Sequence, residues 1–150
     1  MALLCKGTKI LVDPDGASRR VEEMNVGDSI FDPLAQKLTA VANIIPWFAG
    51  KDASTVPVLI PKHALNDSQP AEDFFAPQTL EIFVARKPKG QSMPIAQRVM
   101  ARALVDEGLA SLADQLNGLQ CYLILTVKPC LMMTNGVLSV GKSAPAQKRA

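Results

Sequence analysis

The sequence predicts an all-β domain, and three observations support this class. Short apolar segments rich in β-branched residues recur along the chain, with turn signals roughly every ten residues between them. Eleven prolines are spread over the 150 residues, which disfavours long helices. Hydrophobic residues make up 48% of the chain, enough for the core of a single domain. We expect that domain to span residues 1–140 and a basic, polar tail to follow at 141–150.

The N-terminal third alternates strand and turn signals. Asp13-Pro14-Asp15-Gly16 is a strong turn sequence, and it follows a segment that places Ile10 and Val12 on one face. Pro46 indicates an edge strand or a strand end, because proline cannot donate a ladder hydrogen bond. We expect strands at 7–12, 20–23, 29–31 and 37–48, with turns at 13–16 and 25–28.

The middle of the chain holds one ambiguous segment, residues 95–117. Its apolar spacing fits a helix, but a strand at 97–105 followed by a short helix around 107–117 fits as well. The neighbouring segments are clearer. We expect strands at 56–60, 74–75 and 80–84, a polar stretch at 62–72, a turn at 76–79 and a basic loop at 86–94.

The C-terminal part contains the clearest hairpin signal. Asn135-Gly136 favours a type I′ turn between two apolar arms within residues 131–140. A strand is expected at 119–127, immediately before this hairpin.

Charge and hydropathy give little support to a nucleic-acid or membrane partner. The net charge is +2, which is too small to predict either partner by itself. No apolar run reaches the roughly 18 residues that a membrane span needs. The N-terminus becomes polar too soon for a signal peptide. We therefore expect an intracellular protein that does not contact a membrane.

Cysteine and histidine usage limits the chemistry of the chain. Cys5, Cys121 and Cys130 are an odd number without a C-x-x-C pair, which argues against a disulfide framework and a zinc site. We expect no metal and no cofactor, and we interpret Cys121 and Cys130 as small core residues. His63 is the only histidine, and its polar surroundings indicate a surface residue rather than a catalytic base.

Residues 5–30 carry the most specific motif. Cys5-Lys-Gly-Thr-Lys-Ile-Leu-Val is followed by a glycine turn and by Val21-Glu-Glu-Met-Asn-Val-Gly-Asp-Ser-Ile30. This pattern resembles the opening of Hint (hedgehog/intein) domains, in which Cys, Gly-Thr, an apolar strand and a glycine turn precede Val-Glu-x-Leu-x-x-Gly-Asp-x-Val. Segments 57–60, 64–65 and 74–79 are similar to a bacterial Hint subgroup, and segment 100–105 resembles the strand that follows them there. Segment 131–139 is similar to the closing hairpin of the family, so the resemblance covers about residues 3–140.

The resemblance implies both a fold and a reaction. The fold would be a flattened, horseshoe-like β structure with pseudo-twofold symmetry. In the reaction, the Cys5 thiol would attack the preceding carbonyl group and form a thioester, which a second nucleophile resolves. A histidine normally gives a proton to the leaving amide nitrogen.

The expected proton relay is missing from the sequence. Thr79 occupies the position of the histidine in a Ser-Pro-x-His motif, and Leu123 and Pro129 stand at or near the positions of two further histidines. None of these side chains transfers protons near neutral pH. Cleavage before Cys5 would also release only four residues. Cys5 is therefore interpreted as a vestigial nucleophile, and Asn135 as a turn residue rather than the splicing asparagine of inteins.

Three functions follow from these observations. The leading one is a catalytically degenerate Hint-like domain that serves as a structural or protein-interaction module in a larger assembly, such as a phage particle, in a bacterial cytoplasm or a virion. The second is Cys5-dependent self-cleavage through an N–S acyl shift. The third is weak nucleic-acid binding by the basic clusters, although such clusters are ordinarily solvated. The basic residues concerned are Arg86, Lys87, Lys89, Lys148 and Arg149.

Overall fold

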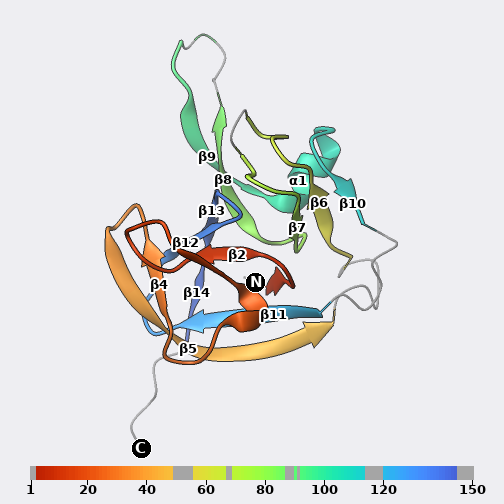
Figure 1. Ribbon diagram of the computed structural model, residues 1–150. Helices are drawn as coiled ribbons and strands as arrows, with labels where there is room; N and C mark the ends of the chain where they lie inside the picture. The colour runs from red at the N-terminus through yellow and green to blue at the C-terminus, as the bar shows by residue number, and fades with distance from the viewer. Residues whose placement is uncertain are drawn as a thin grey trace, which may run out of the picture.

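The computed structural model confirms the all-β class. It describes residues 3–48, 56–66, 69–86, 90, 92–113 and 120–144. The strands of these residues form three sheets. In Figure 1, two long strands curve along one side of the molecule and a hairpin projects from the opposite side.

The first sheet is built on its two long strands, β5 and β11, which pair antiparallel. β1 pairs with the other edge of β11, whereas β4 pairs with the beginning of β5. The strands of this sheet are β1 (Leu3–Cys5), β4 (Ser29–Asp32), β5 (Lys37–Phe48), β11 (Gln120–Thr126) and β14 (Lys142–Ser143).

The second sheet has the strand order β3-β2-β12-β13-β8-β9, and a small third sheet has the order β10-β6-β7. The six strands of the second sheet are β2 (Lys9–Leu11), β3 (Ser18–Arg20), β8 (Glu81–Arg86), β9 (Ile95–Met100), β12 (Leu131–Thr134) and β13 (Val137–Val140). The third sheet consists of β6 (Val58–Ile60), β7 (Phe74–Ala76) and β10 (Ser111–Leu112).

The predicted hairpin is confirmed. Asn135 and Gly136 connect β12 to β13 with φ angles of +46° and +79°, as a type I′ turn requires. Glycine and asparagine adopt this left-handed region at the lowest cost, so the local sequence fixes the turn.

The predicted tail at 141–150 is wrong at its beginning, where the structure has strand β14. Residues 142–143 belong to the first sheet, where they pair parallel with the end of β11. The backbone N–H of Ala144 donates to the Thr126 carbonyl oxygen at 2.7 Å. The β12–β13 hairpin ends beside the last residues of β11. Backbone hydrogen bonds to β11 form there although the sequence of β14 is polar. Residues 145–150 lie outside the described part of the chain.

The predicted return strand at 20–23 is also wrong over most of its length. The strand ends at Arg20, and residues Val21–Glu23 form a 3-10 turn. Tertiary contacts select this turn: the Val21 N–H donates to Thr8 O at 2.8 Å, and the Glu22 carboxylate accepts the Gly7 N–H at 2.8 Å. The turn buries Val21 completely in the core.

One short helix lies in the described residues, α1 (Ala101–Asp106), and it begins and ends earlier than predicted. The sequence placed a helix around 107–117. Residues 107–113 instead contain a turn and β10, and residues 114–117 lie outside the described part. The physical reason is Gly108, whose φ of +77° ends the helix. In the part of the chain that the structure describes, no helix has the length and apolar character needed to cross a membrane.

The predicted strand at 97–105 is confirmed at residues 97–100 and wrong at residues 101–105, which belong to α1. β9 spans residues 95–100 and pairs with β8 along its whole length, from Glu81 opposite Met100 to Arg86 opposite Ile95. Long-range pairing therefore overrides the helical spacing of the apolar residues.

A continuous core joins the sheets and the helix. Its fully buried side chains come from strands of all three sheets, from α1 and from the segment before β8. The largest of them are Leu4, Ile10, Ile30, Ile60, Phe74, Leu80, Ile82, Leu104, Ile124 and Met132.

Candidate functional site

Cys5, the candidate nucleophile, lies directly opposite Cys121 in the first sheet. The Lys6 N–H donates to Gln120 O at 2.8 Å. Because hydrogen-bonded and non-hydrogen-bonded pairs alternate in an antiparallel ladder, Cys5 and Cys121 form a non-hydrogen-bonded pair. Side chains stand closest at such pairs. The two sulfur atoms are 3.2 Å apart and share a thiol–thiol hydrogen bond.

This thiol pair is shielded from water. Cys5 is 1% exposed and Cys121 is 2% exposed, and Phe75 of β7 packs against both. The hydrogen bond with Cys121, burial and the charge that Cys121 can carry all raise the pKa of Cys5. The same hydrogen bond lowers the pKa of Cys121, and burial opposes that change. Cys5 is therefore a neutral thiol near neutral pH, which makes it a poor nucleophile.

The peptide bond that self-cleavage would break lies in regular structure. Leu4 is fully buried and pairs with Tyr122, next to the pair of Cys5 with Cys121. Among the described residues, Cys121 is the titratable group that acts on the Cys5 thiol. The strand pairing places Tyr122 and Cys121 opposite the two residues of this bond, whereas His63, the only histidine of the sequence, lies on the turn after β6.

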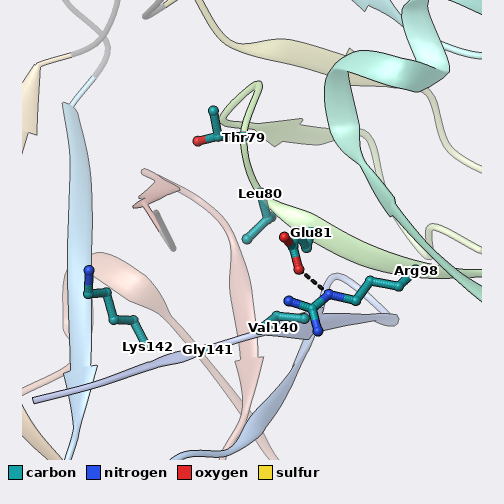
Figure 2. Close-up of a pocket in the computed structure, with 7 residues that line it drawn as sticks. All are labelled: Thr79, Leu80, Glu81, Arg98, Val140, Gly141 and Lys142. Carbon is teal, nitrogen blue, oxygen red and sulfur yellow. Dashed lines mark hydrogen bonds and ion pairs between the residues drawn. The ribbon is translucent and has the colours of Figure 1, made fainter.

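Thr79 belongs to a different feature, an open hollow beside the β8–β9 hairpin (Figure 2). The hollow has a volume of about 190 Å³, and an ion pair between Arg98 and Glu81 lies across it. Cys5 is not among the described residues that line it. These lining residues are Thr79, Leu80, Glu81, Arg98, Val140, Gly141 and Lys142.

The other residues that the sequence analysis considered for proton transfer are Leu123, Pro129 and His63. Leu123 is in the middle of β11, between Leu3 and Ile45 of the neighbouring strands. Pro129 lies in the connection between β11 and β12. His63 is exposed on the turn after β6, as predicted, and its backbone N–H donates to a proline carbonyl oxygen at 3.0 Å.

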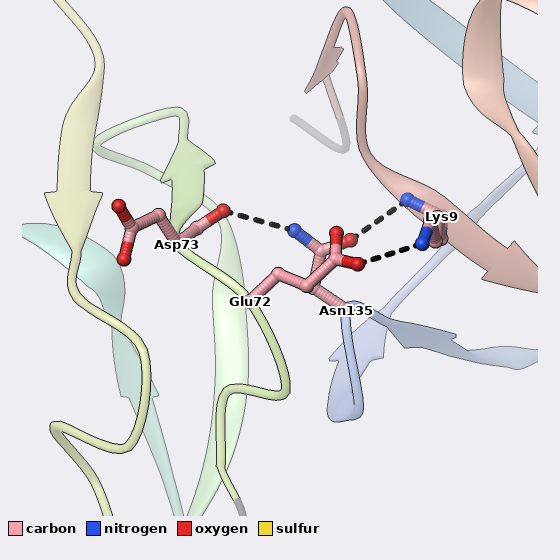
Figure 3. Close-up of polar contacts among 4 residues, drawn as sticks. All are labelled: Lys9, Glu72, Asp73 and Asn135. Atoms are coloured by element: carbon pink, nitrogen blue, oxygen red, sulfur yellow. Dashed lines mark hydrogen bonds and ion pairs between the residues drawn. The ribbon is translucent and has the colours of Figure 1, made fainter.

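Asn135 uses its whole side chain to hold the turn in place (Figure 3). Its Oδ1 accepts the Lys9 N–H at 2.8 Å, and its Nδ2 donates to Asp73 O at 3.3 Å. Beside it, the Lys9 ammonium pairs with the Glu72 carboxylate at 2.6 Å. These contacts confirm that Asn135 is a turn residue.

Of the five basic residues considered for nucleic-acid binding, the structure describes Arg86. Its guanidinium forms an ion pair with Glu107 at 2.5 Å, so its charge is largely neutralised locally. Lys87, Lys89, Lys148 and Arg149 lie outside the described residues.

Sequence reasoning missed an exposed apolar surface at the end of β5. Ile45 and Trp47, which share one face of the strand, are 40% and 49% exposed, and Phe48 on the opposite face is 52% exposed. This part of β5 pairs with β11, and no strand of the described residues pairs with its other edge. The prediction of an edge at Pro46 is confirmed for the described strands. The two aromatic residues that follow it, Trp47 and Phe48, were the sequence feature that could have indicated a contact surface.

No protein-family model matches the chain, and no curated protein matches its sequence. The contacts of the site residues are therefore the basis for assigning a function.

Proposed function

We propose that this chain is a catalytically degenerate Hint-like domain that serves as a structural or protein-interaction module in a larger assembly such as a phage particle. The observation that carries the proposal is the state of Cys5. The thiol at the nucleophile position is buried, neutral and hydrogen-bonded to Cys121.

Self-cleavage places two demands on the site that these residues do not meet. The attacking sulfur must be available as a thiolate, but the raised pKa of Cys5 keeps its proton in place. The leaving amide nitrogen must also receive a proton, a contribution worth roughly 10² to 10⁴ in rate. The hydroxyl of Thr79 cannot supply that proton near neutral pH.

The surface at the end of β5 supports the interaction role. A group of large, exposed apolar side chains marks a contact site more often than a single one does. No strand of the described residues pairs with the other edge of this part of β5, which is where a strand of a partner protein could add. Ile45 and Trp47, which share one face of β5, are therefore the residues that we expect to meet the partner.

The test is the intact mass of a fusion protein. A carrier protein is joined upstream of Met1 and incubated with an excess of a small thiol under reducing conditions. Cys5→Ala removes the candidate nucleophile, and Cys130→Ala is the matched control because it removes a cysteine outside the thiol pair. We expect all three fusions to stay intact for days while circular dichroism shows a folded domain.

One result would overturn the proposal. Release of the carrier from the parent and Cys130→Ala fusions, but not from Cys5→Ala, would identify an autoprocessing domain that uses Cys5. Release from all three would indicate proteolysis and would require repetition with protease inhibitors before the comparison is made.

A further inference from the structure

We propose that Cys5 and Cys121 are a reversible disulfide site, which links the N-terminal strand β1 to β11 under oxidising conditions. This site goes beyond the proposed function and does not depend on the chain being a Hint-like domain.

The backbone geometry suits a disulfide without rearrangement. Non-hydrogen-bonded antiparallel pairs have a Cα–Cα distance of about 4.5 Å, which lies within the range that disulfides span. The sulfur atoms of Cys5 and Cys121 are already 3.2 Å apart. They must approach by only about 1 Å to reach the length of an S–S bond, near 2.05 Å. A small rotation of both side chains achieves this approach.

The residues around Cys5 and Cys121 favour a disulfide between these two cysteines over a disulfide with Cys130 or an adduct with a small thiol. All three cysteines of the chain lie in the described part, and Cys130 contacts Thr126 rather than either member of the pair. The pair is covered by Phe75, and both residues are almost completely buried. A disulfide is less polar than two thiols and carries no charge, so burial does not oppose it. A bulky adduct on either sulfur does not fit the closed position, so a mixed disulfide forms only while β1 is open or while the chain is folding.

The oxidant is a small disulfide such as oxidised glutathione. The Cys121 thiolate attacks one glutathione sulfur, releases one glutathione thiolate and forms a mixed disulfide. Cys5 then loses its proton and attacks the Cys121 sulfur of this mixed disulfide, which releases the second glutathione. Two electrons and two protons pass from the protein, giving one protein disulfide and two molecules of reduced glutathione.

The link would join two segments that are 116 residues apart in the sequence. β1 has three residues, and in the described part of the chain it pairs with β11 alone. The disulfide therefore fixes the N-terminal strand to the sheet and withdraws the Cys5 thiol from any acyl transfer. Opening of this short strand, or folding of the chain, provides access for the oxidant.

The experiment uses Cys130→Ser, which retains only the two paired cysteines. The reduced chain is unfolded in urea and refolded by dilution into buffers of different reduced-to-oxidised glutathione ratios, so access is not limited by burial. Free thiols are alkylated and the intact mass is measured. The same chain kept in urea is the reference, and Cys121→Ser with Cys130→Ser is the control for adducts at Cys5.

We expect the folded chain to lose the mass of two hydrogens and to carry no glutathione. Half-conversion should occur at a glutathione ratio at least about tenfold more reducing than for the chain in urea, because the fold places the sulfurs side by side. Two free thiols or glutathione adducts in the folded chain, under conditions that already link the unfolded chain, would overturn the proposal. If Cys130→Ser does not fold, the parent chain is treated identically, and a linked Cys5–Cys121 peptide is sought after digestion. This readout involves no carrier release, so its failure is distinct from failure of the proposed function.

Discussion

Replacement of Asn135 by alanine should destabilise the protein by an amount that can be worked from its contacts. The substitution leaves the Lys9 N–H without the Oδ1 acceptor that lies 2.8 Å away, and it removes the weaker bond to Asp73 O (Figure 3). It also places alanine at a φ of +46°, in the left-handed region.

Each of these changes has a typical cost. A part-buried N–H that loses its partner costs about 1–3 kcal/mol, and alanine in the left-handed region costs roughly 1–2 kcal/mol. The free energy of unfolding should therefore fall by about 2–5 kcal/mol, a large share of the 5–15 kcal/mol that is typical of a domain.

The assay is urea unfolding followed by circular dichroism, with two matched variants. Asn135→Gly accepts the positive φ but loses the side-chain bonds, so it should cost only the hydrogen-bond part, about 1–3 kcal/mol. Asn135→Asp keeps the Oδ1 acceptor and should cost least. A loss below about 0.5 kcal/mol for Asn135→Ala would refute the structural role of this side chain. Equal losses for alanine and glycine would refute the contribution of backbone conformation.

Two further predictions concern the hairpin exit and the thiol pair. Gly141→Ala should lower the free energy of unfolding by about 1–3 kcal/mol in the same assay, because the new Cβ would lie 2.7 Å from the Cys130 carbonyl oxygen. An unchanged urea midpoint would mean that the backbone shifts to accommodate the Cβ at no cost. In the folded state the pKa of Cys5 is raised above its ordinary value of 9.0, so the stability it contributes is complete below the unfolded pKa and is lost as the pH rises above it. The lowered pKa of Cys121 acts in the opposite direction below this ordinary value, so the comparison is made above it. Under reducing conditions, the parent protein should lose more stability between about pH 9 and about pH 11 than a variant that carries both Cys5→Ala and Cys121→Ala, and equal losses would contradict the raised pKa.

The turns of this protein could be predicted from the sequence because they depend on the conformational preferences and contacts of neighbouring residues. The turn at Asn135-Gly136 depends on the φ preferences of those two residues, and the structure has it as predicted. The turn at 25–28 also has a local bond, since the Asp28 carboxylate accepts the Asn25 N–H at 2.8 Å. The absence of a histidine at Thr79 was also visible in the sequence alone.

The tertiary structure decided what depends on distant segments. Apolar spacing in 95–117 fits a helix and a strand equally well, and pairing with β8 selected the strand for its first six residues. β14 joined the sheet because the hairpin ends beside β11, which a polar sequence does not signal. The state of Cys5 is the clearest case. Its partner Cys121 is 116 residues away, so their contact, their burial and the raised pKa of Cys5 follow from strand register, which local sequence does not encode.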